Sequence, residues 1–276
     1  EGNIVRSAPE SVWGSEVVLA SNQFRQTAEQ IAKNDDIKAV IVRVDSPGGD
    51  AFASDEMLHA LKVLRKKKPV VISMSDTAAS GGYYIALTGD PVLAYENTVT
   101  GSIGVIYGKV NLRKLYDKIG AQKEIMTRGR FAAADSDYTP LDPAARQKLR
   151  NSVEATYRRF VSLTDEARNR SYEDIHQVAQ GRVWLGAQAK QEGLLDELGG
   201  LDRAIQIAKE KAKIDPKEEV RLTVYPRPKS FLERLTQSGG QWVRGLPLIK
   251  EAATAAESLN WNHQILRMMP YSIEIQ

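Results

Sequence analysis

Short apolar runs alternate with segments of helical periodicity in the first half of the chain, and this alternation limits the possible folds more than any other feature. Ile37–Val44 and Pro69–Met74 are apolar and rich in β-branched residues, which is typical of buried parallel strands. Between them, Asp50–Lys66 carries apolar residues near helical spacing, and a Gly-punctuated helix is expected over about 79–88. Such alternation favours an α/β fold, a parallel sheet with helices packed on it.

The pattern continues to the end of the chain. It predicts short strands at 91–94, 102–107 and 121–126, a helix at 112–119, a long charged helix at 142–170, shorter helices up to 213, a strand at 220–225 and helical segments beyond it. Pro216 and the charged residues that follow it mark a boundary. We therefore expect two domains, a main module over 1–214 and a strand-plus-helix extension over 215–276.

Composition excludes several classes of function. The 276 residues include no cysteine, so disulfides and thiolate metal sites are impossible. The net charge of +3 is too weak to indicate nucleic-acid binding, and the run Arg65–Lys68 is interpreted as a solvated turn. No apolar stretch reaches the ~18 residues of a membrane-spanning helix. The chain opens at Glu1 without an initiator Met. We expect its beginning, with any targeting signal or membrane anchor, to lie upstream.

Three Gly-rich turns follow or precede the predicted strands. Asp45–Asp50 (DSPGGD) follows the first strand, Ala78–Ala86 (AASGGYYIA) follows the second, and Thr100–Val105 (TGSIGV) leads into another. A strand-to-helix turn exposes free backbone N–H groups that can stabilise an oxyanion. In the second turn, Ser80 could be an exposed nucleophile or simply a helix cap. Each turn is weak evidence alone, because such turns often only connect elements.

A nucleophilic serine needs a base, and the histidines do not supply an obvious one. His59, His176 and His263 all fall within helical patterns, where surface or packing roles are expected, and none lies in a Gly-rich turn. This disfavours a Ser-His-Asp enzyme. Lysine is the other common base, and it must be neutral to accept a proton.

The succession of DSPGGD, AASGGYYIA and TGSIGV resembles the signal peptide peptidase A family of serine–lysine proteases. The resemblance covers about residues 1–213 and includes the later stretch from Gln180 to Asp196. It implies the fold shared with Clp protease and crotonase, with repeated β-β-α units, a parallel sheet and flanking helices. No metal or organic cofactor is implied.

The resemblance also implies roles for five residues. Ser80 would be the nucleophile, and Ser102 would hydrogen-bond the catalytic lysine and hold it in place. Gly48, Gly49 and the amide of Gly81 would be the oxyanion hole.

One position departs from the family pattern. Single-module members carry the lysine 52 residues after the nucleophile, in a Gly-x-aromatic-Lys segment, whereas this chain reads Gly129-Arg130-Phe131-Ala132. Arg130 stays protonated and cannot replace the lysine. Three explanations remain open. The chain is the downstream half of the long, two-module form, whose upstream module supplies the lysine; or Ala132 is an engineered substitution; or the chain is a naturally inactive homologue.

The resemblance implies hydrolysis of cleaved signal peptides and other small hydrophobic peptides. It also implies a homo-oligomer that includes a lysine-bearing module, associated with the membrane surface on the periplasmic face of the bacterial inner membrane. A crotonase-type acyl-CoA enzyme, which would not need the Ser80 hydroxyl, is one rival. A non-catalytic scaffold that binds peptides or organises a partner is another.

Overall fold

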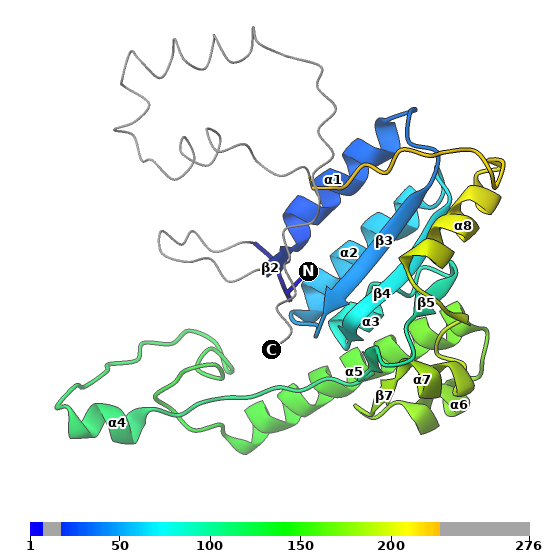
Figure 1. The fold of residues 1–276 in the computed structure, drawn as a ribbon. Coiled ribbons are helices and arrows are strands. Elements are labelled where there is room, and N and C mark those ends of the chain that lie inside the picture. The colour runs from blue at the N-terminus through cyan, green and yellow to red at the C-terminus, as the bar shows by residue number, and fades with distance from the viewer. Residues whose placement is uncertain (8–17, 227–276) are drawn as a thin grey trace, which may run out of the picture. The chain divides into compact units, whose positions relative to one another are not determined.

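The computed structural model describes residues 1–7 and 18–226. The chain divides into two compact units, Glu1–Arg221 and Leu222–Gln276. The first unit holds all the helices and strands described below (Figure 1). The strand predicted at 220–225 is wrong, because this stretch has no regular structure and its Leu222 and Val224 side chains are exposed. The helical segments predicted beyond it lie outside the described residues. The domain boundary predicted after residue 214 stays a prediction.

A six-stranded sheet is built around one long central strand, β4 (Val70–Ala79). The other strands are β3 (Val40–Ser46), β5 (Val92–Ala94), β6 (Val99–Gly101), β7 (Val183–Leu185) and β8 (Glu197–Leu198). β3, β5 and β6 all pair with β4 in parallel, β8 pairs with β5 in parallel, and only β7 runs antiparallel, along β6. A separate parallel pair joins β1 (Asn3–Val5) to β2 (Val18–Ala20). The predicted α/β class and parallel sheet are therefore confirmed.

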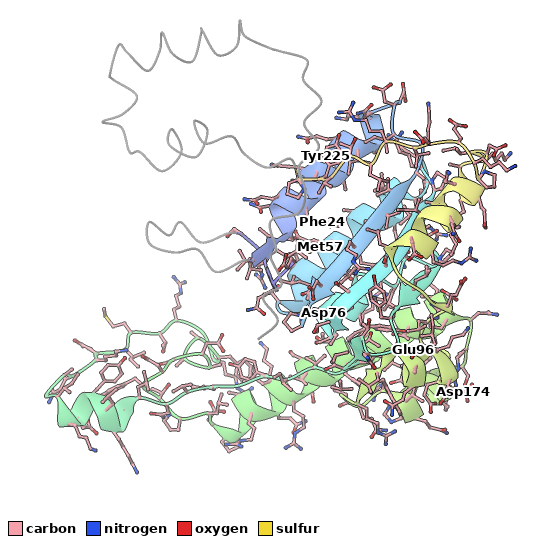
Figure 2. All side chains as sticks on the ribbon, viewed as in Figure 1. Phe24, Met57, Asp76, Glu96, Asp174 and Tyr225 are labelled. Atoms are coloured by element: carbon pink, nitrogen blue, oxygen red, sulfur yellow. The ribbon has the colours of Figure 1, made fainter. Side chains whose placement is uncertain are left out.

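Helices flank this sheet (Figure 1). They are α1 (Ser21–Lys33), α2 (Ala51–Leu64), α3 (Gly81–Tyr84), α4 (Arg113–Lys118), α5 (Pro143–Arg168), α6 (Tyr172–Val178), α7 (Gly186–Gln191) and α8 (Leu201–Lys211). Helix α2 begins at Asp50, whose side chain accepts a hydrogen bond from Ala53 N–H, and it buries Met57, labelled in Figure 2. Helix α8 packs Ala204 and Ile207 against the sheet. The core thus lies between the helices and β4.

Two predicted strands are absent. Residues 102–112 and 119–128 form no regular structure, and the strand near Thr100 is instead β6, which ends at Gly101. A strand needs a neighbour to satisfy its backbone groups. In the described residues these stretches pair with none, and Ile106 and Met126 are 98% and 90% exposed. Conversely, the pattern missed β7 and β8, which have only three and two residues.

Residues 103–142, here called the arm, connect β6 to α5. The arm contains α4 and runs out from the sheet alongside α5 (Figure 1). Asp137 organises it, accepting hydrogen bonds from Tyr116 Oη at 2.6 Å and from Lys123 Nζ at 2.7 Å. Lys148 of α5 lies over the Phe131 ring at 4.5 Å. The arm is thus held together by its own polar contacts and by α5.

Candidate active site

The three Gly-rich turns meet at one edge of the sheet. Ser46 at the end of β3 pairs with Ala78, and Gly101 at the end of β6 pairs with Ala79. Because the three strands are parallel, their carboxyl ends lie at the same edge, and the turns that follow them are neighbours. The β3–β4 register shifts between Val44 and Ser46 just before this edge. Irregularities of this kind often redirect strand ends next to active sites.

Ser80 occupies the sharp turn between β4 and α3. Its backbone has φ 50° and ψ −118°, a conformation that non-glycine residues rarely adopt. Ser80 stands at the N-cap position, but its side chain makes no capping hydrogen bond. The interpretation of Ser80 as an ordinary side-chain cap is therefore wrong. A half-buried serine on a strained strand-to-helix turn presents its hydroxyl, as nucleophiles at such turns do.

The Gly48–Gly49 turn packs directly against Ser80 and Gly81. A Cβ added to Gly48 would lie 2.9 Å from Ser80 Cβ and 2.6 Å from the Gly81 nitrogen. A Cβ on Gly81 would lie 3.2 Å from the Gly49 nitrogen. Gly48 also has φ +105°, which side chains disfavour. Only glycine therefore lets the two backbones approach this closely.

Where the Gly48–Gly49 turn meets the turn at Ser80, two backbone N–H groups are available to a ligand. Within residues 1–7 and 18–226, the N–H groups of Gly49 and Gly81 have no hydrogen-bond acceptor. The Gly48 N–H differs, because it donates to Ser46 Oγ at 3.1 Å. Gly49 and Gly81 therefore each present an N–H group that could donate to an anionic oxygen, while Gly48 gives the close backbone approach.

Ser102 follows β6 on the same edge and is half-buried. It too has a positive φ, 50°, and its N–H donates to the carbonyl of Arg182 at 2.7 Å. Its hydroxyl has no hydrogen-bond partner in the described part of the chain. The backbone of Ser102 is therefore fixed while its side chain stays free to bind another group.

Within the described residues, Ser80 Oγ hydrogen-bonds no basic side chain. Ala132 lies in the arm, exposed, with its N–H directed to Gly129 O at 3.3 Å. His59 is exposed on α2, and His176 Nδ1 is hydrogen-bonded to Tyr157 Oη at 2.7 Å. His263 lies outside the described residues. These residues also include no cluster of three or more His, Cys, Asp or Glu side chains that could hold a metal.

Neither Lys109 nor Lys123 of the arm hydrogen-bonds Ser80 in the described residues. Hydrogen bonds to Asp137 and Tyr116 raise the pKa of Lys123, whereas a base needs a lowered pKa. Lys109 Nζ is buried, but it hydrogen-bonds no group in the described residues, Ser80 Oγ included.

Two residues next to the site carry structural roles that the sequence pattern did not reveal. Ser46 is buried, donates to Gly2 O at 2.7 Å and accepts from Gly48 N–H. Ser54 is fully buried against Gly81 and donates to Asp50 O at 2.9 Å. Ser46 stands inside the DSPGGD motif, but only the position of Gly2, which is 44 residues away along the chain, makes its role visible.

Comparison with known proteins identifies the family. A model described as peptidase family S49 matches residues 62–215. The chain belongs to this family. The resemblance to the signal peptide peptidase A family and the expected Clp protease-like fold are thereby confirmed.

Several S49 relatives cover much of the chain. It is 40% identical over 247 residues to "Serine protease SPPA, chloroplastic" of Arabidopsis thaliana, a match that spans 89% of this chain and 36% of that protein. It is 36% identical to "Putative protease slr0021" of Synechocystis sp., covering 81% of this chain and 79% of the relative. "Protease 4" of Haemophilus influenzae is 38% identical over 63% of this chain and 28% of its own length. The chain therefore spans only about a third of two of these relatives.

Among the helices of residues 1–7 and 18–226, none combines the length and the apolar character that a bilayer-spanning segment requires.

Proposed function

We propose that this S49 chain is the serine-bearing part of a serine–lysine endopeptidase. Ser80 Oγ attacks the carbonyl carbon of the scissile peptide bond and transfers its proton to a neutral lysine amine. The N–H groups of Gly49 and Gly81 hold the oxyanion. When the tetrahedral species collapses, the lysine gives the proton to the leaving amine, and water then hydrolyses the acyl-enzyme through the same base.

The observation that carries this proposal is the strained conformation of Ser80 next to the Gly49 and Gly81 amides, which have no acceptor in the described residues. Backbone strain at a non-glycine residue persists only where the surrounding structure enforces it, and it gathers at functional sites. Here the strain exposes a hydroxyl that caps no helix, next to Gly49 and Gly81. A serine needed only to connect β4 to α3 would gain nothing from φ 50°.

We propose further that the base comes from outside this chain. Support comes from Ala132 at the family's lysine position and from the absence of any lysine bonded to Ser80 in the described residues. Support also comes from the relatives, because the chain matches only 36% of SPPA and 28% of Protease 4. Their remaining length leaves room for a homologous module that carries the lysine. Ser102, with its free hydroxyl on the same edge, would position that amine.

The proposed substrates are cleaved signal peptides and other small hydrophobic peptides, met at the membrane surface on the periplasmic face by an oligomer of the protein. One relative, 31% identical over 69% of this chain, is named "Putative signal peptide peptidase SppA". The small residues around Ser80 suit narrow apolar side chains near the scissile bond. The alternative is an inactive scaffold that binds peptides, and the observation in its favour is Ala132 at the family's lysine position.

The decisive experiment measures hydrolysis of a fluorogenic peptide with small apolar residues before the cleaved bond. It compares this chain, the chain joined to its natural upstream region, and the joined form with Ser80→Ala. We expect activity only in the joined form, abolished by Ser80→Ala. Silence in all three folded proteins would refute the peptidase and favour the scaffold. Activity in this chain alone would refute the external base, and activity that survives Ser80→Ala would refute the serine nucleophile.

A further inference from the structure

Strand β1 lies along the turn that carries the proposed oxyanion donor Gly49. Gly2 N–H donates to Asp45 O at 2.9 Å, Ile4 N–H donates to Gly48 O at 2.8 Å, and Asp50 N–H donates to Ile4 O at 2.9 Å. Ser46 Oγ adds a bond to Gly2 O at 2.7 Å. The DSPGGD turn is therefore hydrogen-bonded along its length to a segment more than 40 residues away in sequence.

Ile4 anchors this contact. Its side chain is 1% exposed, although it stands in a three-residue strand near the start of the chain. The fit against Gly49 is close, since a Cβ on Gly49 would lie 2.1 Å from Ile4 O and 2.8 Å from Ile4 N. Gly49, with φ +152°, is thus pressed against β1 on one side and faces Gly81 on the other. A shift of β1 would move the Gly49 amide relative to Ser80.

Arg6 extends the contact to the start of α2. Its Nε lies 3.2 Å from both carboxylate oxygens of Asp50, and its guanidinium lies over the Phe52 ring at 5.0 Å. On the other side, Arg6 O accepts a hydrogen bond from Ser21 Oγ of α1 at 3.3 Å. Residues 2–6 thus connect α1 to both ends of the DSPGGD turn, at Asp45 and at Asp50.

We propose that β1 and the adjoining Arg6 form a positioning element of the active site, in which Ile4 and Arg6 hold the Gly49 amide where the oxyanion forms. The inference rests on the proposed function and adds a residue set far from Ser80 in sequence. Neither Ile4 nor Arg6 touches substrate in this scheme. They act through the Gly48–Gly49 turn, so their loss weakens binding of the tetrahedral species more than binding of an uncleaved peptide.

The test uses a ligand pair that separates these two kinds of binding. A peptide boronic acid with small apolar residues forms a tetrahedral adduct with serine and places an oxygen in the oxyanion hole, whereas the matching peptide amide does not. Affinities for both are measured by calorimetry on the active, joined protein and on its Ile4→Ala and Arg6→Gln variants. Two variants are the matched controls. Ile207→Ala changes a core residue of α8, and Arg25→Gln removes an exposed ion pair with Glu29 on α1.

For Ile4→Ala we expect boronate affinity to fall roughly 10- to 100-fold, the range for a displaced oxyanion donor, with amide affinity within about twofold. Arg6→Gln should lower boronate affinity about threefold or more, while both controls bind as the parent does. Arg6 is exposed, so this variant folds and decides the question even if Ile4→Ala does not fold. Parent-like boronate affinity in the folded variants, or equal loss for both ligands, would overturn the inference. Failure of the parent protein to bind the boronate through Ser80 would instead refute the proposed peptidase.

Discussion

The backbone N–H of Ser80 donates a hydrogen bond of 2.9 Å to the carbonyl oxygen of Gly101. This bond continues the β4–β6 ladder one residue past the end of β4 and fixes the proposed nucleophile beside the strand end that Ser102 follows. It also engages the Ser80 amide, which is therefore not free to donate to an oxyanion. The amides left for that role are those of Gly49 and Gly81.

Glycine at position 80 should give a more stable protein than alanine. Ala keeps the strain of φ 50°, whereas Gly adopts positive φ without a steric penalty. We expect Ser80→Gly to exceed Ser80→Ala by about 1 kcal/mol in free energy of unfolding, measured in urea, with both variants inactive. Equal stabilities would mean that the surrounding structure does not strain this residue.

A methyl group at position 81 should sharply lower activity through a clash that a second substitution relieves. A Cβ on Gly81 would lie 2.5 Å from Ser54 Oγ, while its next neighbours are 3.2 Å away. We expect Gly81→Ala to lower kcat at least about 100-fold, as loss of an oxyanion donor does. Removing the Ser54 hydroxyl makes room for most of the added methyl.

The rescue is measured as peptidase kcat of Gly81→Ala, Ser54→Ala and the double variant. Ser54→Ala alone should keep most of the activity, because it removes one hydrogen bond to Asp50 O and nothing that touches substrate. The double variant should recover roughly 10-fold over Gly81→Ala. Strict additivity of the two losses would show that the clash with Ser54 is not what displaces the turn.

Asp50 should make stability depend on pH in the acid range. Burial alone would raise the pKa of this carboxyl, but hydrogen bonds from Ala53 N–H and Arg6 outweigh it and hold the pKa below its usual value. A lowered folded-state pKa contributes stability above the unfolded pKa of about 4, and this is lost as pH falls through the folded pKa. The exposed ion pair limits the effect to less than about 1 kcal/mol.

The measurement compares wild type with Asp50→Asn by urea unfolding at about pH 7 and pH 3. Asparagine still caps α2 but does not titrate, so the advantage of the wild type should shrink at the lower pH. Asp142→Asn is the control, because Asp142 caps α5 at Ala145 N–H (2.8 Å) with no ion pair in the described residues. An advantage of unchanged size at both pH values would contradict the proposed role of the Arg6 pair.

Lys109→Met should stabilise the protein. The buried Nζ of Lys109 has no hydrogen-bond partner in the described residues, and burying such a group is unfavourable. Methionine has a similar length and no charge, so we expect a gain of about 1 kcal/mol in free energy of unfolding. Lys114→Met on exposed α4 is the control and should change little. A loss of stability at position 109 would contradict the prediction, because it would mean that the ammonium group contributes favourably to folding.

The parts of the fold that the sequence predicts correctly are those with local signals. β3 and β4 are apolar β-branched runs, and α2 starts at a capping aspartate. The arm and the residue before it are predicted less well, because Ser102–Tyr107 and Ala121–Met126 are apolar enough for strands but have no neighbouring strand to pair with in the described residues. Pairing depends on distant residues, so composition alone cannot decide it.

In the site too, features with a local sequence signal could be predicted, and features that depend on distant contacts could not. The motifs around Gly48, Ser80 and Ser102 could be recognised from sequence, and the parallel strands bring them together. The positive φ of Ser80 and the engaged amide of Gly48 could not be predicted, because both depend on contacts between turns. The contribution of Ile4 was hidden for the same reason, since a single apolar residue near a chain start carries no pattern.

Strand β4 pairs with β3 along one edge and with β5 and then β6 along the other. Its amides should therefore exchange with deuterium only when the whole sheet opens, and more slowly than those of the arm. Ser80 follows the last residue of this strand. We therefore expect the proposed nucleophile to stand at the end of a slowly exchanging strand, so that local fluctuations of the arm leave its position unchanged.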